Sequence, residues 1–176
     1  NLIEIKTPIQ VKNMTYESAL IYKNDVILFY EANGKNLQKS VFQPKISLIN
    51  NSITYLKYPN IEYRITDVTS TDEKNRFWAI NYFWPGDKKY LNPAKDKINE
   101  NYDLIHNNKN SETIERLIEF EISKNKINLT NKNPIRLKLN DENSRNWEGI
   151  VRLDQKGFII ATDKYPQMIL AFVEYK

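Results

Sequence analysis

Residues 64–87, RITDVTSTDEKNRFWAINYFWPGD, decide the fold of this chain. They predict a β-hairpin: a first strand that enters through Ile65, a polar turn over residues 72–75, and a returning strand over Arg76–Phe83. The sequence Pro85-Gly86-Asp87 then ends the second strand, because proline cannot donate a hydrogen bond to a strand ladder.

The composition is that of one globular domain, with 176 residues of which 40% are hydrophobic and 27% charged. The net charge is +4, but the lysines are scattered among Asn, Asp and Glu and form no basic stripe. We therefore expect no nucleic-acid partner. No apolar run approaches the about 20 residues of a membrane span, and none has the form of a signal peptide. Because the chain begins with Asn rather than Met, we expect that residues upstream have been removed.

Residue counts also limit the chemistry. There is no cysteine, which excludes disulfides and thiolate sites, and the one histidine, His106, lies in a polar stretch. A Ser-His-Asp triad or a His-rich zinc site is therefore not expected. Any metal would be held by oxygen ligands, which favours calcium.

Strand patterns continue along most of the chain and no long helix is indicated, so the sequence predicts an all-β fold. The predicted strands are residues 2–6, 18–22, 26–30, 41–49, 52–57, 65–71, 76–83, 116–122, 126–129, 134–139, 149–153, 157–162 and 167–174. A long polar insertion over residues 88–113, with a short helix near residues 94–100, separates two of them. A connection of this length is usually functional or mobile.

Three of the predicted hairpins resemble one another. In each, an acidic residue opens the first strand and a polar residue closes the second, with separations of 14, 14 and 15 residues. The pairs are Glu17 with Glu31, Asp67 with Asn81, and Glu148 with Asp163. Four-stranded units that repeat around an inner hairpin are typical of β-propeller blades. The alternative is that any all-β protein contains hairpins of similar length.

We therefore expect one partial β-propeller of about three four-stranded blades, over residues 9–60, 61–141 and 142–176. Strand 2–6 would complete the third blade or belong to a blade upstream. Closed propellers have about four to eight blades, so three would expose apolar faces. This predicts half of a six-bladed propeller, completed either by a second copy of the chain or by missing upstream blades.

The six paired polar residues would share one face of the propeller, because the start of a hairpin's first strand and the end of its second lie at the same edge. Carboxylates gathered there would share protons, bind a cation or pair with bases. Arg64 and Lys164 are the candidate basic partners. Tyr16, Tyr82, Trp84 and Trp147 are candidate apolar walls for a ligand. Alternatively, the acidic residues bind backbone amides and join neighbouring blades, and the aromatic residues pack between blades.

Three segments resemble a family of uncharacterised bacterial exported propeller proteins: residues 16–36, 62–87 and 146–173. The match covers most of the chain except residues 88–113, and it implies an extracytoplasmic location, periplasmic or secreted, and a protein about twice this length. Glu148-Gly149 and the phrase at residues 76–78 are more distantly similar to gluconolactonase/senescence-marker and phytase-like esterase propellers. That resemblance implies one calcium ion in the channel, with Glu17, Asn81, Glu148 and Asp163 as ligands and Glu31 as a weaker candidate.

Two classes of function are left open. One is an extracytoplasmic propeller that binds a small polar ligand or cation in an acidic central channel, with Arg64, Asp67, Tyr16, Trp147 and Lys164 as ligand-binding candidates. The other is a calcium-dependent hydrolase of lactones or phosphoesters, in which the metal acts as a Lewis acid. The sequence does not decide whether the protein is an enzyme.

Overall fold

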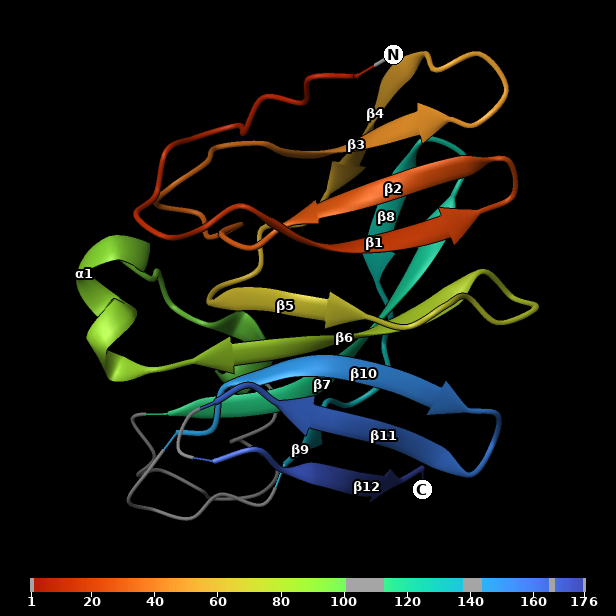
Figure 1. Ribbon diagram of the computed structural model, residues 1–176. Helices are drawn as coiled ribbons and strands as arrows, with labels where there is room; N and C mark the ends of the chain where they lie inside the picture. The colour runs from red at the N-terminus through yellow and green to blue at the C-terminus, as the bar shows by residue number, and fades with distance from the viewer. Residues whose placement is uncertain (1, 101–112, 138–143, 165–166, 176) are drawn as a thin grey trace.

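The computed structural model describes residues 2–100, 113–137, 144–164 and 167–175 (Figure 1). They form an almost entirely β structure, which confirms the all-β prediction. The strands are β1 (Tyr16–Tyr22), β2 (Asp25–Tyr30), β3 (Val41–Ser47), β4 (Ile53–Tyr58), β5 (Arg64–Val68), β6 (Arg76–Phe83), β7 (Ile114–Ser123), β8 (Lys126–Leu129), β9 (Ile135–Arg136), β10 (Trp147–Leu153), β11 (Gly157–Thr162) and β12 (Leu170–Glu174). Within the described ranges, helical structure is limited to η1 (Pro85–Asp87), α1 (Lys88–Leu91) and residues 97–100.

Eight strands form a nearly closed, barrel-like sheet in the order β1-β2-β3-β4-β8-β7-β6-β5, with the short β9 paired to β7. Two antiparallel groups, β1–β4 and β5–β8, meet where β4 and β8 pair in parallel at Lys57 and Lys126. At the other end of the order, the residues after β2 meet the start of β5. There Ala32 forms a β-bridge with Arg64, and the Ile65 amide donates to the Glu31 carbonyl. This second junction is called the seam below.

The remaining strands, β10-β11-β12, form a separate three-stranded antiparallel sheet. It lies beside β5, β6 and β7 (Figure 1). Two side chains of β5 tie it to the barrel: Thr66 Oγ1 donates to the Trp147 carbonyl at 2.6 Å, and Asp67 Oδ2 accepts from the Ile150 amide at 2.9 Å.

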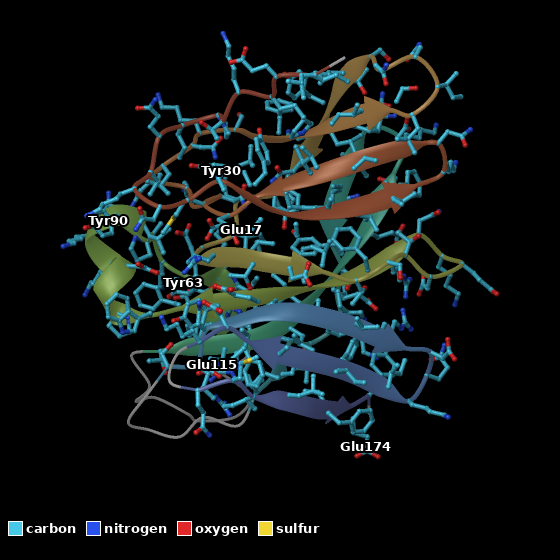
Figure 2. All side chains as sticks on the ribbon, in the orientation of Figure 1. Glu17, Tyr30, Tyr63, Tyr90, Glu115 and Glu174 are labelled. Carbon is cyan, nitrogen blue, oxygen red and sulfur yellow. The ribbon has the colours of Figure 1, made fainter. Side chains whose placement is uncertain are left out.

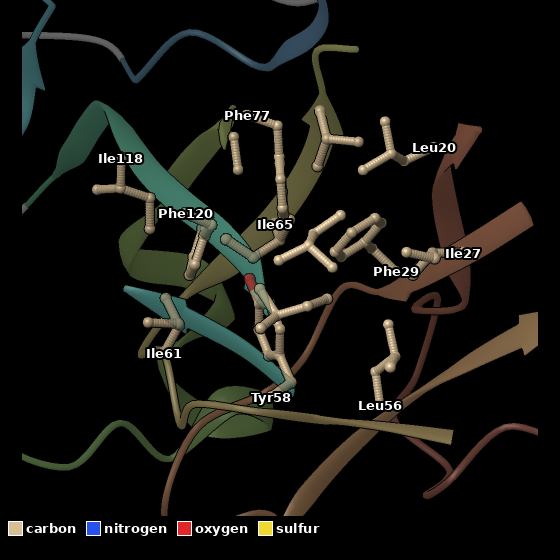
Figure 3. Close-up of a cluster of buried hydrophobic side chains, with 14 of the residues drawn as sticks. Leu20, Ile27, Phe29, Leu56, Tyr58, Ile61, Ile65, Phe77, Ile118 and Phe120 are labelled. Carbon is tan, nitrogen blue, oxygen red and sulfur yellow. The ribbon is translucent and has the colours of Figure 1, made fainter. Parts of the chain in front are cut away.

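Strand β6 is buried on both faces, which explains its nearly continuous apolar sequence. Phe77 and Ala79 point into the barrel core, which also contains Phe29 and Phe120 (Figure 3). On its other face, Trp78 packs in the core between the barrel and the three-stranded sheet, with Trp147 and Phe158.

The hairpin predicted for residues 64–87 is confirmed as β5 and β6. Its turn is fixed by Asp72, whose Oδ1 accepts from the amides of Lys74 and Arg76, both at 2.9 Å. Asn75 takes a positive φ of 59°, which asparagine tolerates better than most residues.

The structure does not show a propeller of four-stranded blades. In a propeller, equivalent faces of successive blades point the same way around the ring. Here Phe29 and Ala79, which hold equivalent places in their hairpins, both face the same core, because the two groups of strands join edge to edge around one interior.

One predicted strand is wrong and another is confirmed only in part. Residues 2–6 form no strand; the Lys6 carbonyl instead accepts a hydrogen bond from the Tyr16 hydroxyl. Of residues 134–139 only Ile135 and Arg136 pair with β7, whereas the fourth strand of that group is β8. Residues 138–139, His106 and residues 101–112 of the predicted insertion lie outside the described residues.

Candidate ligand-binding groove

The first strands of the three hairpins, β1, β5 and β10, lie side by side (Figure 1). Each carries a bulge near its start, at Glu17 in β1, at Thr66-Asp67 in β5 and at Glu148 in β10. A bulge interrupts the alternation of side chains and re-aims them. The acidic residue that opens each predicted hairpin, Glu17, Asp67 or Glu148, therefore lies at an irregular position in its strand.

At this edge, the Glu31 carboxylate lies beneath the seam and is fully buried. Its Oε2 is 2.5 Å from Arg64 Nε, and its Oε1 accepts from the Thr15 amide at 3.1 Å. Burial raises the pKa of Glu31 from 4.5 to about 7; Arg64 and the Thr15 amide oppose this rise, and the charge of Glu17 adds to it.

Arg64 also forms part of a surface groove with a volume of about 590 Å³. The groove is lined by Lys12, Asn13, Met14, Arg64, Tyr82, Trp84, Asp87, Tyr90 and Asn146. Figure 2 shows Tyr90 on α1 and Glu17 on β1 at the same end of the molecule. The residues that line the groove come from five separate segments of the chain: 12–14, 64, 82–84, 87–90 and 146.

The polar part of the groove contains both hydrogen-bond donors and acceptors. Arg64 Nη1 is 3.9 Å from Asp87 Oδ2, and its guanidinium carbon is 5.8 Å from the centre of the Tyr82 ring. Asn146 uses its Nδ2 to donate to Glu148 Oε1. Its Oδ1 is shielded from solvent and accepts no hydrogen bond from the described part of the chain.

The apolar part of the groove is dominated by Trp84, which is 50% exposed. Its indole lies directly against Gly86: a Cβ added to Gly86 would come within 2.2 Å of two ring atoms. Glycine at this position therefore lets the tryptophan lie flat on the turn that forms η1. On the far side, the Tyr90 ring has Lys89 Nζ 4.8 Å and Lys12 Nζ 5.9 Å from its centre.

Four of the six predicted acidic or amide residues are linked electrostatically. Arg64 interacts with Glu31 and Glu148, Glu17 interacts with these same two carboxylates, and Asp163 interacts with Glu148. Burial raises the pKa of Glu148, with repulsion from Asp163 and Glu17 adding to the effect. Within the described ranges, no three His, Asp or Glu side chains are grouped so that they could hold a metal ion.

The other two predicted residues hold the fold together. Asp67 accepts from the amides of Val68 and Ile150, which joins β5 to β10. Asn81 Nδ2 donates to the carbonyls of Glu62 and Arg64, and its Oδ1 accepts from Arg116 Nε at 2.8 Å. Asp67 thus binds backbone amides, as the structural alternative expected, whereas Asn81 binds backbone carbonyls and an arginine.

Of the other candidates, Arg64, Tyr82 and Trp84 line the groove, whereas Tyr16, Trp147 and Lys164 do not. Tyr16 packs edge-on against Tyr30, with ring centres 5.6 Å apart. Trp147 is 1% exposed and its Nε1 donates to Glu115 Oε2 at 2.6 Å. Lys164 is exposed.

Sequence reasoning missed Lys12, Asn13, Met14, Tyr90 and Asn146, which come from loops and from α1 and have no periodic pattern. It also missed a buried ion pair, in which Arg116 Nη1 is 2.8 Å from Asp96 Oδ2. Arg116 is directly opposite Asn81 in the β6–β7 ladder, so pairing the predicted strands 76–83 and 116–122 in this register would have brought it to the candidate residue Asn81.

Comparisons with family models, with curated proteins and with solved structures found no match to this chain. Among the residues described, no helix has the length and apolar character needed to cross a membrane.

Proposed function

We propose that this protein is a binding domain that holds a small polar ligand in the groove over Arg64. The observation that carries the proposal is that Asn146, whose buried Oδ1 has no partner among the described residues, lines the same groove as Arg64 and the half-exposed Trp84. Ligand sites typically combine a few fixed polar groups with aromatic surface in this way.

The polar groups define what the ligand must offer. Asn146 Oδ1 and the Asp87 carboxylate require hydrogen-bond donors, whereas Arg64 and Lys12 can only donate and so require acceptors. Hydroxyl groups serve as both donor and acceptor, so a ligand with several hydroxyls satisfies all four residues.

The aromatic groups define its shape. Trp84 offers a flat apolar surface, held in place by Gly86, and Tyr82 lies beneath Arg64. A ligand with one apolar face and a rim of hydroxyls matches this arrangement. A single sugar ring, neutral or carrying one carboxylate, is the ligand class with this chemistry.

Isothermal titration with a panel of monosaccharides and sugar acids tests the proposal, with tryptophan fluorescence as a second readout. We expect at least one compound to bind with a Kd below about 1 mM. Trp84→Ala should weaken binding of that compound at least about tenfold, a change of about 1.4 kcal/mol.

The matched control is Tyr55→Ala. It removes an aromatic ring that is 62% exposed on β4 and lies outside the groove lining, so it should leave affinity unchanged. A panel without binders, or binding that survives Trp84→Ala, would contradict the proposal.

The same samples test a cation in place of the sugar. Glu17, Glu148 and Asp163 give this edge a negative potential, which a divalent ion would reduce. If calcium raises the Tm, and Glu148→Gln removes the increase, the site binds a cation. Without such a shift, the neutral or acidic sugar remains the favoured ligand.

A further inference from the structure

The strands β5 and β6 carry a second hollow at the end opposite the Arg64 groove. There the β5–β6 turn lies near the β10–β11 turn (Figure 1), and a groove of about 530 Å³ is lined by residues of both. A hollow of about 380 Å³ adjoins it, because Arg76 and Glu119 line both. Together they are called the turn-end groove.

One wall of the turn-end groove holds a fixed arginine. Arg152 Nε donates to the Asp154 carbonyl at 3.0 Å, and its Nη1 is 3.4 Å from Asp72 Oδ2. Its side chain is only 11% exposed, and its guanidinium carbon lies 5.6 Å from the centre of the Tyr175 ring. A guanidinium held on several sides loses little conformational freedom when it binds a ligand.

Arg76 contributes an unpaired donor. Its Nε is shielded from solvent and has no hydrogen-bond partner in the described residues. Glu121 Oε2 lies 3.5 Å away, close enough for an ion pair but not aligned for a hydrogen bond. Buried donors are nearly always paired, so Arg76, which lines both hollows, keeps a donor that its contact with Glu121 does not satisfy.

Five acidic side chains line the turn-end groove, and three of them already have partners. Asp72 accepts from two backbone amides and from Arg152. Glu119 is buried and accepts from Thr130 Oγ1 at 2.9 Å. A further cation, Lys132, lies with its Nζ 4.6 Å from the Tyr175 ring centre. Glu121 pairs with Arg76, and Glu73 and Asp154 are exposed. The groups that can donate to an anionic ligand include Arg76, Arg152 and Lys132.

We propose that the turn-end groove is a second binding site, which takes the carboxylate or phosphate group of a small ligand between Arg76, Arg152 and Lys132. Guanidinium groups bind both anions through paired N–H donors, so the two sources share one chemistry. The site does not depend on the Arg64 groove, since the two grooves have no lining residue in common.

The test follows the arginine Nε–Hε signals of the ¹⁵N-labelled protein by NMR while inorganic phosphate or acetate is added at constant ionic strength. We expect the Arg76 and Arg152 signals to shift saturably, with a Kd below about 10 mM for at least one anion, while the Arg64 signal stays in place. The stronger anion identifies the ligand group. Equal, non-saturating shifts of all arginines would overturn the proposal.

Two variants make the result specific. Arg76→Lys keeps the charge but deletes the Nε donor, and should weaken binding of the favoured anion at least about fivefold. Lys132→Gln, a change that spares every hydrogen bond described above, should weaken it about twofold or more by removing one charge. Lys57→Gln, exposed on β4, is the control and should leave the Kd unchanged. Unchanged affinity in both groove variants would overturn the proposal.

Discussion

Arg64 Nε lies 2.5 Å from Glu31 Oε2, and this ion pair joins the two ends of the barrel-like sheet at the seam. Glu31 lies directly after β2 and Arg64 begins β5. Because Arg64 also lines the candidate groove, one side chain serves both the closure of the sheet and the proposed binding site. A change in the charge of Glu31 therefore affects both.

The first prediction is that stability falls as the pH rises from about 4.5 to about 7. The folded protein holds the Glu31 proton up to a pKa of about 7, whereas the unfolded chain releases it near 4.5. Between these values the folded state binds more protons, so the free energy of unfolding decreases as the pH increases. The upper limit for this one group is roughly 3 kcal/mol. Urea unfolding across this pH range measures the slope.

Glu31→Gln is the matched variant for this prediction, because glutamine keeps the shape but cannot titrate. The decrease between pH 4.5 and 7 should be smaller in Glu31→Gln than in the original protein. The part that remains comes from Asp67, Asp87 and Glu148, whose pKa values burial also raises. An identical slope in both proteins would show that Glu31 does not titrate in this range.

The second prediction concerns Asp67, which links β5 to β10. Asp67→Ala removes the acceptor of the Ile150 amide and should cost about 1–3 kcal/mol of unfolding free energy. Hydrogen exchange at the Ile150 amide should accelerate more than exchange inside the barrel. Glu17→Ala, at the corresponding bulge but exposed, should change stability by less than about 0.5 kcal/mol. Equal costs for the two variants would argue against the link.

The third prediction compares two glycines of the three-stranded sheet. Gly157 has a φ of 151°, and a Cβ there would lie 2.2 Å from the Val173 carbonyl oxygen. Gly157→Ala should therefore cost roughly 2 kcal/mol or more. At Gly149 an added Cβ would meet only the Ala161 Cβ at 3.5 Å, so Gly149→Ala should be nearly neutral. Urea unfolding of both variants tests this, and a neutral Gly157→Ala would contradict it.

The sequence predicted the hairpins well because their determinants are local. The Asp72 side chain and Asn75 define the β5–β6 turn, and both are visible within a few residues of sequence. The strand bounds of β6 were predicted without error.

The way in which the hairpins combine was not predictable by the same means. Pairing of β4 with β8 rests on one bridge, between Lys57 and Lys126, and neither lysine carries a signal for it. An apolar strand such as β6 fits two folds equally well. It could belong to a propeller blade packed between two other blades, or to the wall of a barrel that a second sheet covers. Local patterns leave this choice open, since only long-range contacts distinguish the two.

The candidate site was predicted in part. Hairpin geometry predicted that Glu17, Glu31, Glu148 and Asp163 lie near one another, and this depends only on which ends of paired strands coincide. Asn146 and Lys12 were missed because their place in the groove depends on how separate loops meet, which no spacing in the sequence encodes.

The fourth prediction is that Gly86→Ala disables the groove without unfolding the protein. The new methyl group would overlap the Trp84 ring and must push the indole away from the wall of the groove. Because Trp84 is half exposed, we expect a loss of less than about 1 kcal/mol in stability but a red-shifted emission and stronger acrylamide quenching. Any sugar bound by the original protein should bind to Gly86→Ala about as weakly as it binds to Trp84→Ala.

Gly149→Ala is the control for adding a methyl group elsewhere. Unchanged emission and quenching would show that Trp84 keeps its place, and the indole would then not depend on Gly86 for its position.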